Sequence, residues 1–251
     1  MQIQLIRNAT LKIYMNDRFI LVDPMLGPKG SLPSFAGIEP NPTVDLPYPI
    51  EQILEGVDFI LLTHLHADHW DEEAMKVIDK GMPIFCQKGD LARIEDKGFT
   101  RVTEIEDKTT FEGITIYRTP AQHGSGDVLQ EMGPASGYVL DAKEEPTIYL
   151  VGDSILTNEV RVVIDEHQPE IVISNSGGAI MPEHPAENII MDAAETAMLA
   201  EYIHPYLLVA THLEALDHCT VSREEIELIG YSSEERNIFV PYDGDLLDFE
   251  L

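Results

Sequence analysis

The chain has 251 residues, of which 44% are hydrophobic, so it is long enough to bury a substantial core. Its 45 acidic residues outnumber its 16 basic ones and give a formal net charge of −29, which repels phosphate backbones and anionic lipid. Nucleic acid and membranes are therefore not expected as partners, and the excess acid indicates a soluble, self-repelling surface. The sequence leaves the oligomeric state open.

The sequence contains two cysteines, Cys86 and Cys219, which are far apart and lack C-x-x-C spacing. Neither a disulfide framework nor a thiolate zinc site is predicted from them. Met1 leads directly into strand-like sequence, without a basic-then-apolar export signal and without a long apolar span. We therefore expect a cytoplasmic protein.

The first part of the chain reads as antiparallel strands, because apolar and polar residues alternate. Strands are expected at residues 2–6, 10–15 and 18–22, with a turn at 16–17. The third strand ends at Asp23, before Pro24.

The segment from Pro24 to Pro49 contains seven prolines, and no regular helix or strand fits it. Residues such as Leu32 and Phe35 are nevertheless too apolar for a disordered linker. A long ordered loop is more often functional than not. We expect this segment to form part of the wall of a binding pocket.

A group of metal-binding side chains follows the apolar strand expected at residues 58–62. His64 and His66 lie two apart in an extended segment, so their side chains point the same way. Asp68 and His69 follow where the chain turns, so they can face a second point nearby. Imidazole and carboxylate are ligands for divalent metals, and chance alone does not explain four of them in six residues.

The rest of the chain alternates helices with strands. Helices are expected at residues 50–54, 71–80, 90–96, 158–166, 188–203 and 222–230. Strands are expected at residues 83–87, 101–105, 109–118 as a hairpin, 138–140, 171–174, 206–210, 238–240 and 246–249. Asp71 is placed to N-cap its helix, and Ser222 with Glu225 forms a capping box. The glycine-rich residues 124–137 are expected to loop near the site.

The run from His64 to His69 matches the H-x-H-x-D-H motif of the metallo-β-lactamase superfamily of binuclear metal hydrolases. Three further sites of that family follow in the same order, at His123, Asp153 and His212. The chain therefore resembles this superfamily along essentially its whole length. The resemblance implies an α/β fold, a four-layer αββα sandwich of two mixed β-sheets with helices outside. Because the motif sites extend from residue 64 to residue 212, we expect a single domain over residues 1–251.

The resemblance implies two divalent metal ions, one held by His64, His66 and His123, the other by Asp68, His69 and His212, with Asp153 between them. Zinc suits such ligands best, and manganese or iron is an alternative. A metal-bridging water whose pKa is lowered to about 7 would be hydroxide at neutral pH. Asp68 is expected to relay a proton. The implied activity is hydrolysis of a small ester, lactone or phosphoester.

Within the superfamily the chain is most similar to the ascorbate-6-phosphate lactonase-like group, through residues 22–24, 63–71 and 149–153. His66 stands where the diiron oxygen-reducing relatives carry glutamate, which favours hydrolysis over redox chemistry. Two alternatives stay open. One is a phosphodiesterase, and the other is a non-catalytic metal-dependent sensor or binding protein.

Four more residues are candidates for positioning a ligand or contacting substrate. Asp23 would fix the tautomer of a ligating histidine, or is simply an acid at a strand end. Asn175 lies in a glycine-containing turn whose backbone amides could approach a substrate oxygen. His184 precedes a helix and either reaches the pocket or lies on the surface. His218 competes with His212 for the last ligand position, and His212 is preferred because it directly ends an apolar strand.

Overall fold

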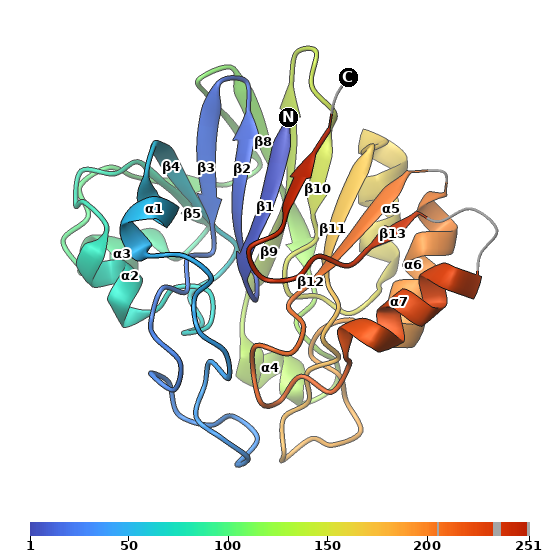
Figure 1. Cartoon of the computed structure of the whole chain (residues 1–251). Helices are drawn as coiled ribbons and strands as arrows, with labels where there is room; N and C mark the ends of the chain where they lie inside the picture. The colour runs from blue at the N-terminus through green and yellow to red at the C-terminus, as the bar shows by residue number, and fades with distance from the viewer. Residues whose placement is uncertain (205, 233–236, 250–251) are drawn as a thin grey trace.

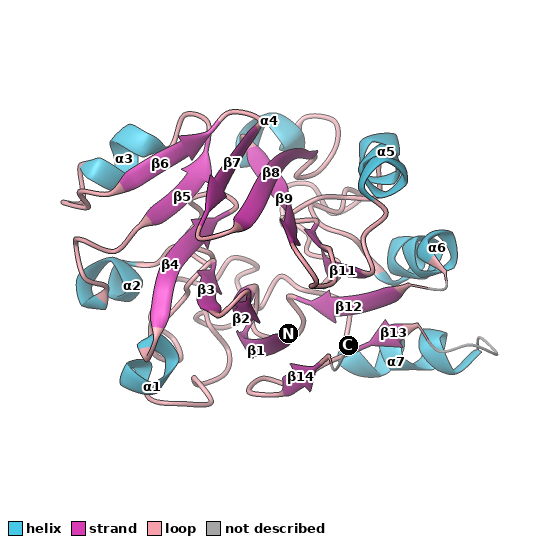
Figure 2. Ribbon diagram, turned by 90° about the horizontal axis from the view of Figure 1, so that it is seen from above, coloured by secondary structure: helices cyan, strands magenta, loops and turns pink. Residues whose placement is uncertain are grey.

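Two β-sheets packed face to face form the centre of the structure, and helices cover their outer faces (Figure 1, Figure 2). The computed structural model describes residues 1–204, 206–232 and 237–249. Within these residues each sheet has seven strands and contains both parallel and antiparallel pairs. The predicted αββα sandwich of two mixed sheets is therefore confirmed.

The first sheet is built from the N-terminal half of the chain and one C-terminal strand. Its strands are β1 (Gln2–Arg7), β2 (Thr10–Met15), β3 (Arg18–Val22), β4 (Val57–Leu62), β5 (Ile84–Gln87), β6 (Val102–Ile105) and β14 (Leu246–Asp248). Their order is β14-β1-β2-β3-β4-β5-β6, antiparallel as far as β3 and parallel beyond it. The β2–β3 hairpin turns at Asn16 and Asp17, whose φ angles of 49° and 59° are both left-handed. These two residue types tolerate that conformation, which a two-residue hairpin turn requires.

The second sheet repeats this arrangement with the C-terminal half of the chain. Its strands are β7 (Lys108–Phe111), β8 (Ile114–Ala121), β9 (Ala135–Ala142), β10 (Ile148–Leu150), β11 (Ile171–Asn175), β12 (Leu207–Thr211) and β13 (Ile238–Phe239). Their order is β13-β12-β11-β10-β9-β8-β7, parallel from β13 to β10 and antiparallel from β10 to β7. Strands β8, β10, β11 and β12 consequently run in the same direction, so their carboxyl ends reach the same edge.

Helices lie outside both sheets. They are α1 (Ile50–Leu54), α2 (Glu72–Val77), α3 (Leu91–Glu95), α4 (Val128–Met132), α5 (Asn158–His167), α6 (Ala193–Ile203) and α7 (Arg223–Ser232). The first three pack on the first sheet, and α5, α6 and α7 pack on the second, whereas α4 lies among the loops at the lower edge in Figure 1. Among the described residues, no helix combines the length and the apolar composition needed to cross a bilayer.

Strand β4 shows why the central strands are apolar at every position. Phe59 and Leu61 point into the core between the sheets, whereas Ile60 and Leu62 pack under the helices of the first sheet. Successive residues of a strand face opposite sides, so a strand covered on both faces has no polar side. This burial fixes the strand that leads to His64.

Three predictions of local structure are wrong, and the other predicted elements agree within a few residues. The helix expected over residues 188–203 begins at Ala193, because the Asp192 carboxylate caps it by accepting a hydrogen bond from the Glu195 amide (2.9 Å). The helix after Asp71 ends at Val77, since the next residue is extended and buried. The expected loop at 124–137 instead contains helix α4 and the start of β9.

The segment from Pro24 to Pro49 contains no helix and no strand longer than a single bridge, as predicted, and that antiparallel bridge pairs Leu32 with Asn41. The fully buried guanidinium of Arg7 anchors its ends. It donates hydrogen bonds of 2.8–3.1 Å to the carbonyl oxygens of Met25, Gly27 and Val44. The two ends of the loop are therefore held together by a side chain from β1.

Candidate metal centre

All seven predicted ligands lie at the carboxyl ends of strands, at one edge of the sandwich. The four residues of the H-x-H-x-D-H motif follow β4 of the first sheet, while His123, Asp153 and His212 follow β8, β10 and β12 of the second. The structure brings these residues into two groups, His64, His66 and His123, and Asp68, His69, Asp153 and His212. Within each group the donor atoms all lie within 4.8 Å of one another.

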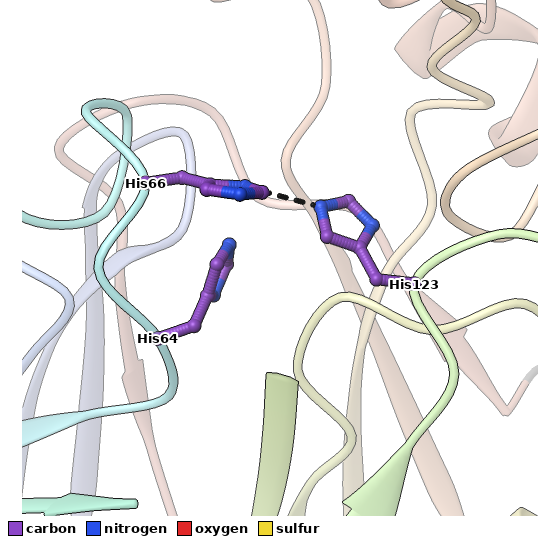
Figure 3. A group of neighbouring side chains, drawn as sticks. All are labelled: His64, His66 and His123. Carbon is purple, nitrogen blue, oxygen red and sulfur yellow. Dashed lines mark hydrogen bonds between the residues drawn. The ribbon is translucent and has the colours of Figure 1, made fainter. Parts of the chain in front are cut away.

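The first group consists of three histidines whose rings converge (Figure 3). The Nδ1 atom of His64 lies 3.0 Å from the hydroxyl of Thr63, and that of His123 lies 2.8 Å from the carbonyl oxygen of Ile189. These outer contacts direct Nε2 of both rings towards the group. His66 is turned the other way, since its Nδ1 lies 3.3 Å from Nε2 of His123.

The second group combines two histidines with two carboxylates. Nε2 of His69 lies 3.2 Å from Oδ2 of Asp153 and 3.4 Å from Oδ2 of Asp68. Nε2 of His212 lies 3.2 Å from the same Asp68 oxygen. Oδ2 of Asp153 is also 3.4 Å from Nε2 of His123, so this carboxylate lies between the two groups.

The residues present fit divalent metal ions. Nε2 of His64 and Nε2 of His69 are buried and make no well-aligned hydrogen bond, although Oδ2 of Asp153 lies 3.9 Å and 3.2 Å from them. A buried polar atom without a partner is costly, and buried nitrogens of this kind are normally satisfied. Neutral imidazoles and carboxylates are the donor set of zinc and similar metals, so the unpartnered nitrogens point to ligation.

Asp23 lies behind this centre, as the sequence suggested. Its buried carboxylate contacts Nδ1 of His69 at 2.8 Å and accepts hydrogen bonds from the amide (2.8 Å) and hydroxyl (2.6 Å) of Thr63. Its φ of 43° is left-handed, a strained conformation that is commoner at functional sites. The contact leaves Nε2 of His69 facing the other donors.

Asn175 contacts the centre through its side chain, whereas the sequence suggested a contact through backbone amides. Its amide group donates a short hydrogen bond to Oδ1 of Asp153 and accepts one from the Thr211 hydroxyl (2.9 Å). Asp153 is therefore held on one oxygen while the other faces the histidines. The sequence placed Asn175 near the site but did not predict this contact.

Two residues at the centre were missed. The Asn8 carbonyl oxygen accepts a hydrogen bond from the His212 amide (3.0 Å), and the Asn8 side chain donates to the Asp68 carbonyl oxygen (3.2 Å). Sγ of Cys219 lies 3.6 Å from Nδ1 of His212. A turn between two strands predicts a left-handed Asn8, observed at φ 60°, but no local signal shows that the turn reaches residues so distant in sequence.

The electrostatics of the metal-free centre favour protons on two histidines. Burial lowers the pKa of His212, but Asp153 and hydrogen bonds to Asp68 and Cys219 raise it to about 10. Burial also opposes the charged form of His69, yet its three neighbouring carboxylates hold its pKa well above the usual range. In the absence of metal, the protons on His69 and His212 therefore offset the negative charge of the buried carboxylates.

Metal binding is accordingly expected to release protons. The metal must displace the protons of His69 and His212, so the apparent affinity for Zn²⁺ should rise as the pH is raised towards 10. Calorimetric titration of metal-free protein at pH 7, in buffers of different ionisation enthalpy, should give about two protons released from these histidines per filled centre, and up to about one more from metal-bound water that becomes hydroxide. A heat that is the same in all buffers would contradict this prediction.

A cavity of about 200 Å³ opens onto the centre. Its lining residues are Phe35, His66, Ala67, Asp68, His123, Met132, Asp153, Ala179, Met181, Ile189, His212 and His218. Phe35 comes from the proline-rich loop, which confirms that this loop forms part of the pocket wall. Five of the candidate ligands line it, His66, Asp68, His123, Asp153 and His212, and the remaining lining is largely apolar.

The two other candidate histidines behave differently. His218 is 6% exposed and lines the cavity, and its Nδ1 is buried without a hydrogen-bond partner. Burial lowers the pKa of His218 to about 4, so the ring is neutral at pH 7. His184 is absent from the cavity lining and pairs instead with Glu131 at 3.1 Å. Of the two, only His218 is therefore placed to contact a bound molecule.

Comparison with known proteins agrees with this geometry. A family model for the beta-lactamase superfamily domain matches residues 18–213. The UPF0173 protein YddR of Bacillus subtilis (strain 168) is 36% identical over 99% of this chain and 100% of its own length. Other proteins of the UPF0173 group are named metal-dependent hydrolases.

Two solved structures match nearly the full chain. A possible metal-dependent hydrolase from Veillonella parvula has a TM-score of 0.94 and 32% identity, with 98% of each chain covered. An isothiocyanate hydrolase from Delia radicum gut bacteria has a TM-score of 0.91 and 34% identity, with 99% of each chain covered. The chain therefore belongs to the metallo-β-lactamase superfamily, as a member of its UPF0173 family of metal-dependent hydrolases.

Proposed function

We propose that the chain is a binuclear hydrolase whose two groups of ligands would each hold a metal ion, with Asp153 placed to contribute its carboxylate to both. The observation that carries this proposal is the position of Asp153 Oδ2, 3.2 Å from Nε2 of His69 and 3.4 Å from Nε2 of His123. A carboxylate shared by two cations offsets part of their repulsion. Zinc fits the donors best, with manganese or iron as alternatives. When bound, the metal ions supply hydroxide at neutral pH and polarise the substrate.

The chain contributes two groups that face the substrate. Asp68 lines the cavity, where its carboxylate can take the remaining proton of the attacking hydroxide and pass it to the leaving group. His218 lines the same cavity as a neutral imidazole, and its Nδ1 is shielded from the cavity. The ring can therefore contact a bound substrate and help to orient it.

The cavity favours a small, uncharged substrate. Its volume of about 200 Å³ is below the usual range for ligand pockets. Among the described residues that line it there is no lysine or arginine, so the bound metal ions would be the only cations available to a phosphate group. These features favour an ester or lactone over a phosphoester, and over the phosphorylated lactone that the ascorbate-6-phosphate lactonase-like group suggests.

Isothiocyanates are a second candidate substrate class. A relative of this chain, 34% identical over 99% of both chains, is an isothiocyanate hydrolase. An isothiocyanate is small and uncharged, and its central carbon is an electrophile that water can attack. Its organic group would suit the apolar wall formed by Met132, Met181 and Ile189.

A substrate panel tests the proposed function. We expect zinc- or manganese-loaded protein to hydrolyse a γ-lactone, a p-nitrophenyl ester or phenethyl isothiocyanate. The kcat/KM for the best of these should be at least about tenfold higher than that for bis-p-nitrophenyl phosphate, because the small, apolar cavity suits an uncharged substrate better. A preference for the phosphodiester would favour the phosphodiesterase alternative. Full metal occupancy without turnover of any compound would favour a sensor or binding protein.

A further inference from the structure

The carboxylate of Asp217 binds residues 34–41, the tip of the proline-rich loop over residues 24–49. It accepts hydrogen bonds from the backbone amides of residues 35, 36, 38 and 39, at 2.9–3.3 Å. The Ser34 hydroxyl and the Asn41 side-chain amide (2.8 Å) also donate to it. Burial opposes the charge, but these donors hold the pKa of Asp217 well below its usual range. The loop tip is thus folded around one ionised side chain.

Asp217 belongs to the segment that immediately follows the candidate ligand His212. The same segment also holds the C-terminal part of the loop. Thr43 donates hydrogen bonds from its amide to the Ala215 carbonyl oxygen and from its hydroxyl to the Glu214 carbonyl oxygen, both at 2.8 Å. The loop is therefore tied to the chain that leaves the metal centre. Its position relative to the centre is fixed through these contacts.

The contacts place Phe35 in the wall of the cavity. Its ring meets His218 edge-on, with centroids 5.1 Å apart and an interplanar angle of 88°, and both residues line the cavity. Met132, Met181 and Ile189 line it as well. Phe35 is the largest apolar side chain among the lining residues, and it alone comes from the proline-rich loop.

We propose that Phe35 sets the size of the substrate that the cavity accepts, and that Asp217 is the positioning residue that holds Phe35 in place. This inference rests on the proposed function, because it takes the cavity above the metal centre as the substrate site. An aromatic ring in the wall of a small pocket limits the length of the groups that fit, so replacing it with a smaller side chain should admit longer apolar groups. Removing the Asp217 carboxylate should release the loop and also admit longer apolar groups, although Asp217 itself does not line the cavity.

Binding of n-alkyl thiols, from ethanethiol to hexanethiol, tests this without turnover. Thiolates bind zinc and cobalt, and the visible spectrum of the Co²⁺-loaded protein reports each Kd. We expect F35A to bind hexanethiol about tenfold more tightly relative to ethanethiol than the unmodified protein does, because more methylene groups fit. F35L, which keeps an apolar side chain, should fall between the two. An unchanged dependence on chain length in F35A would overturn the role of Phe35.

The positioning role has a separate readout. In D217A we expect faster hydrogen exchange at the amides of residues 35–39 and a chain-length dependence close to that of F35A, while D217N, which keeps one acceptor oxygen, should change less. E39Q is the matched control, because it removes one exposed carboxylate from the same loop and leaves Asp217 intact. Unchanged exchange or an unchanged thiol profile in D217A would overturn the role of Asp217. A failed substrate panel would contradict the hydrolase proposal, whereas the thiol profile would still report the size limit.

Discussion

Replacing Asp153 by asparagine is expected to lower kcat by about a thousandfold and to remove at least one bound metal ion per chain. Oδ2 of Asp153 lies within 4.0 Å of Nε2 of four histidines, His64, His69, His123 and His212. Asparagine has almost the same shape but no charge, so the two cations would lose the anion that they share. Turnover with the best substrate of the panel, together with elemental analysis of the purified protein, measures both effects.

D141N is the matched control, because Asp141 is an exposed carboxylate on β9 of the same sheet. The same chemical change there should leave kcat and the metal content unchanged. Two metal ions per chain and undiminished turnover in D153N would contradict the bridging role.

Replacing Asp23 by asparagine should produce a different pattern, in which stability falls together with metal affinity. Three hydrogen-bonded contacts end on this buried carboxylate, two from Thr63 and one from His69. Loss of an outer partner of a ligating histidine lowers metal affinity by about 10- to 100-fold. Breaking a buried charged pair lowers the free energy of unfolding by about 3 kcal/mol. Competition with a zinc chelator and urea denaturation measure the two effects.

D96N serves as the comparison for D23N, since Asp96 is exposed at the end of α3. It should shift neither the urea midpoint nor the zinc affinity. If D23N bound zinc as tightly as the unmodified protein, Asp23 would be only an acid at the end of a strand.

Much of the fold was predictable because its strands carry a strong periodic signal. Alternation in the first hairpin and continuous apolar runs such as residues 58–62 identify half-buried and fully buried strands directly. The start of α6 was not predictable from periodicity, because residues 188–191 are apolar enough for a helix but pair with other loops instead. Ile189 donates to the Ala179 carbonyl oxygen and Met191 to that of Ser154. Such pairings depend on the assembled fold.

In the candidate centre, too, residues with a local sequence signal were predictable and residues placed only by the assembled fold were not. The seven motif residues are recognisable because each lies at the end of a strand, and the sheet order then brings them together. Asn8 and Cys219 have no such signal, since their contacts with His212 exist only after β1, β12 and the following loop have packed. Phe35 was found only as part of a loop too apolar to be disordered. Its exact partner, His218, required the structure.

Both sheets contribute candidate ligands to the centre. Four follow β4 of the first sheet, and three follow strands of the second sheet. Bound cations would therefore act as non-covalent cross-links between the two halves of the molecule. Opening the sandwich at this edge would require releasing them, so the added stability grows with free metal as RT ln(1 + [M]/Kd). Resistance to proteolysis should consequently depend on the surrounding metal concentration as well as on the buried core.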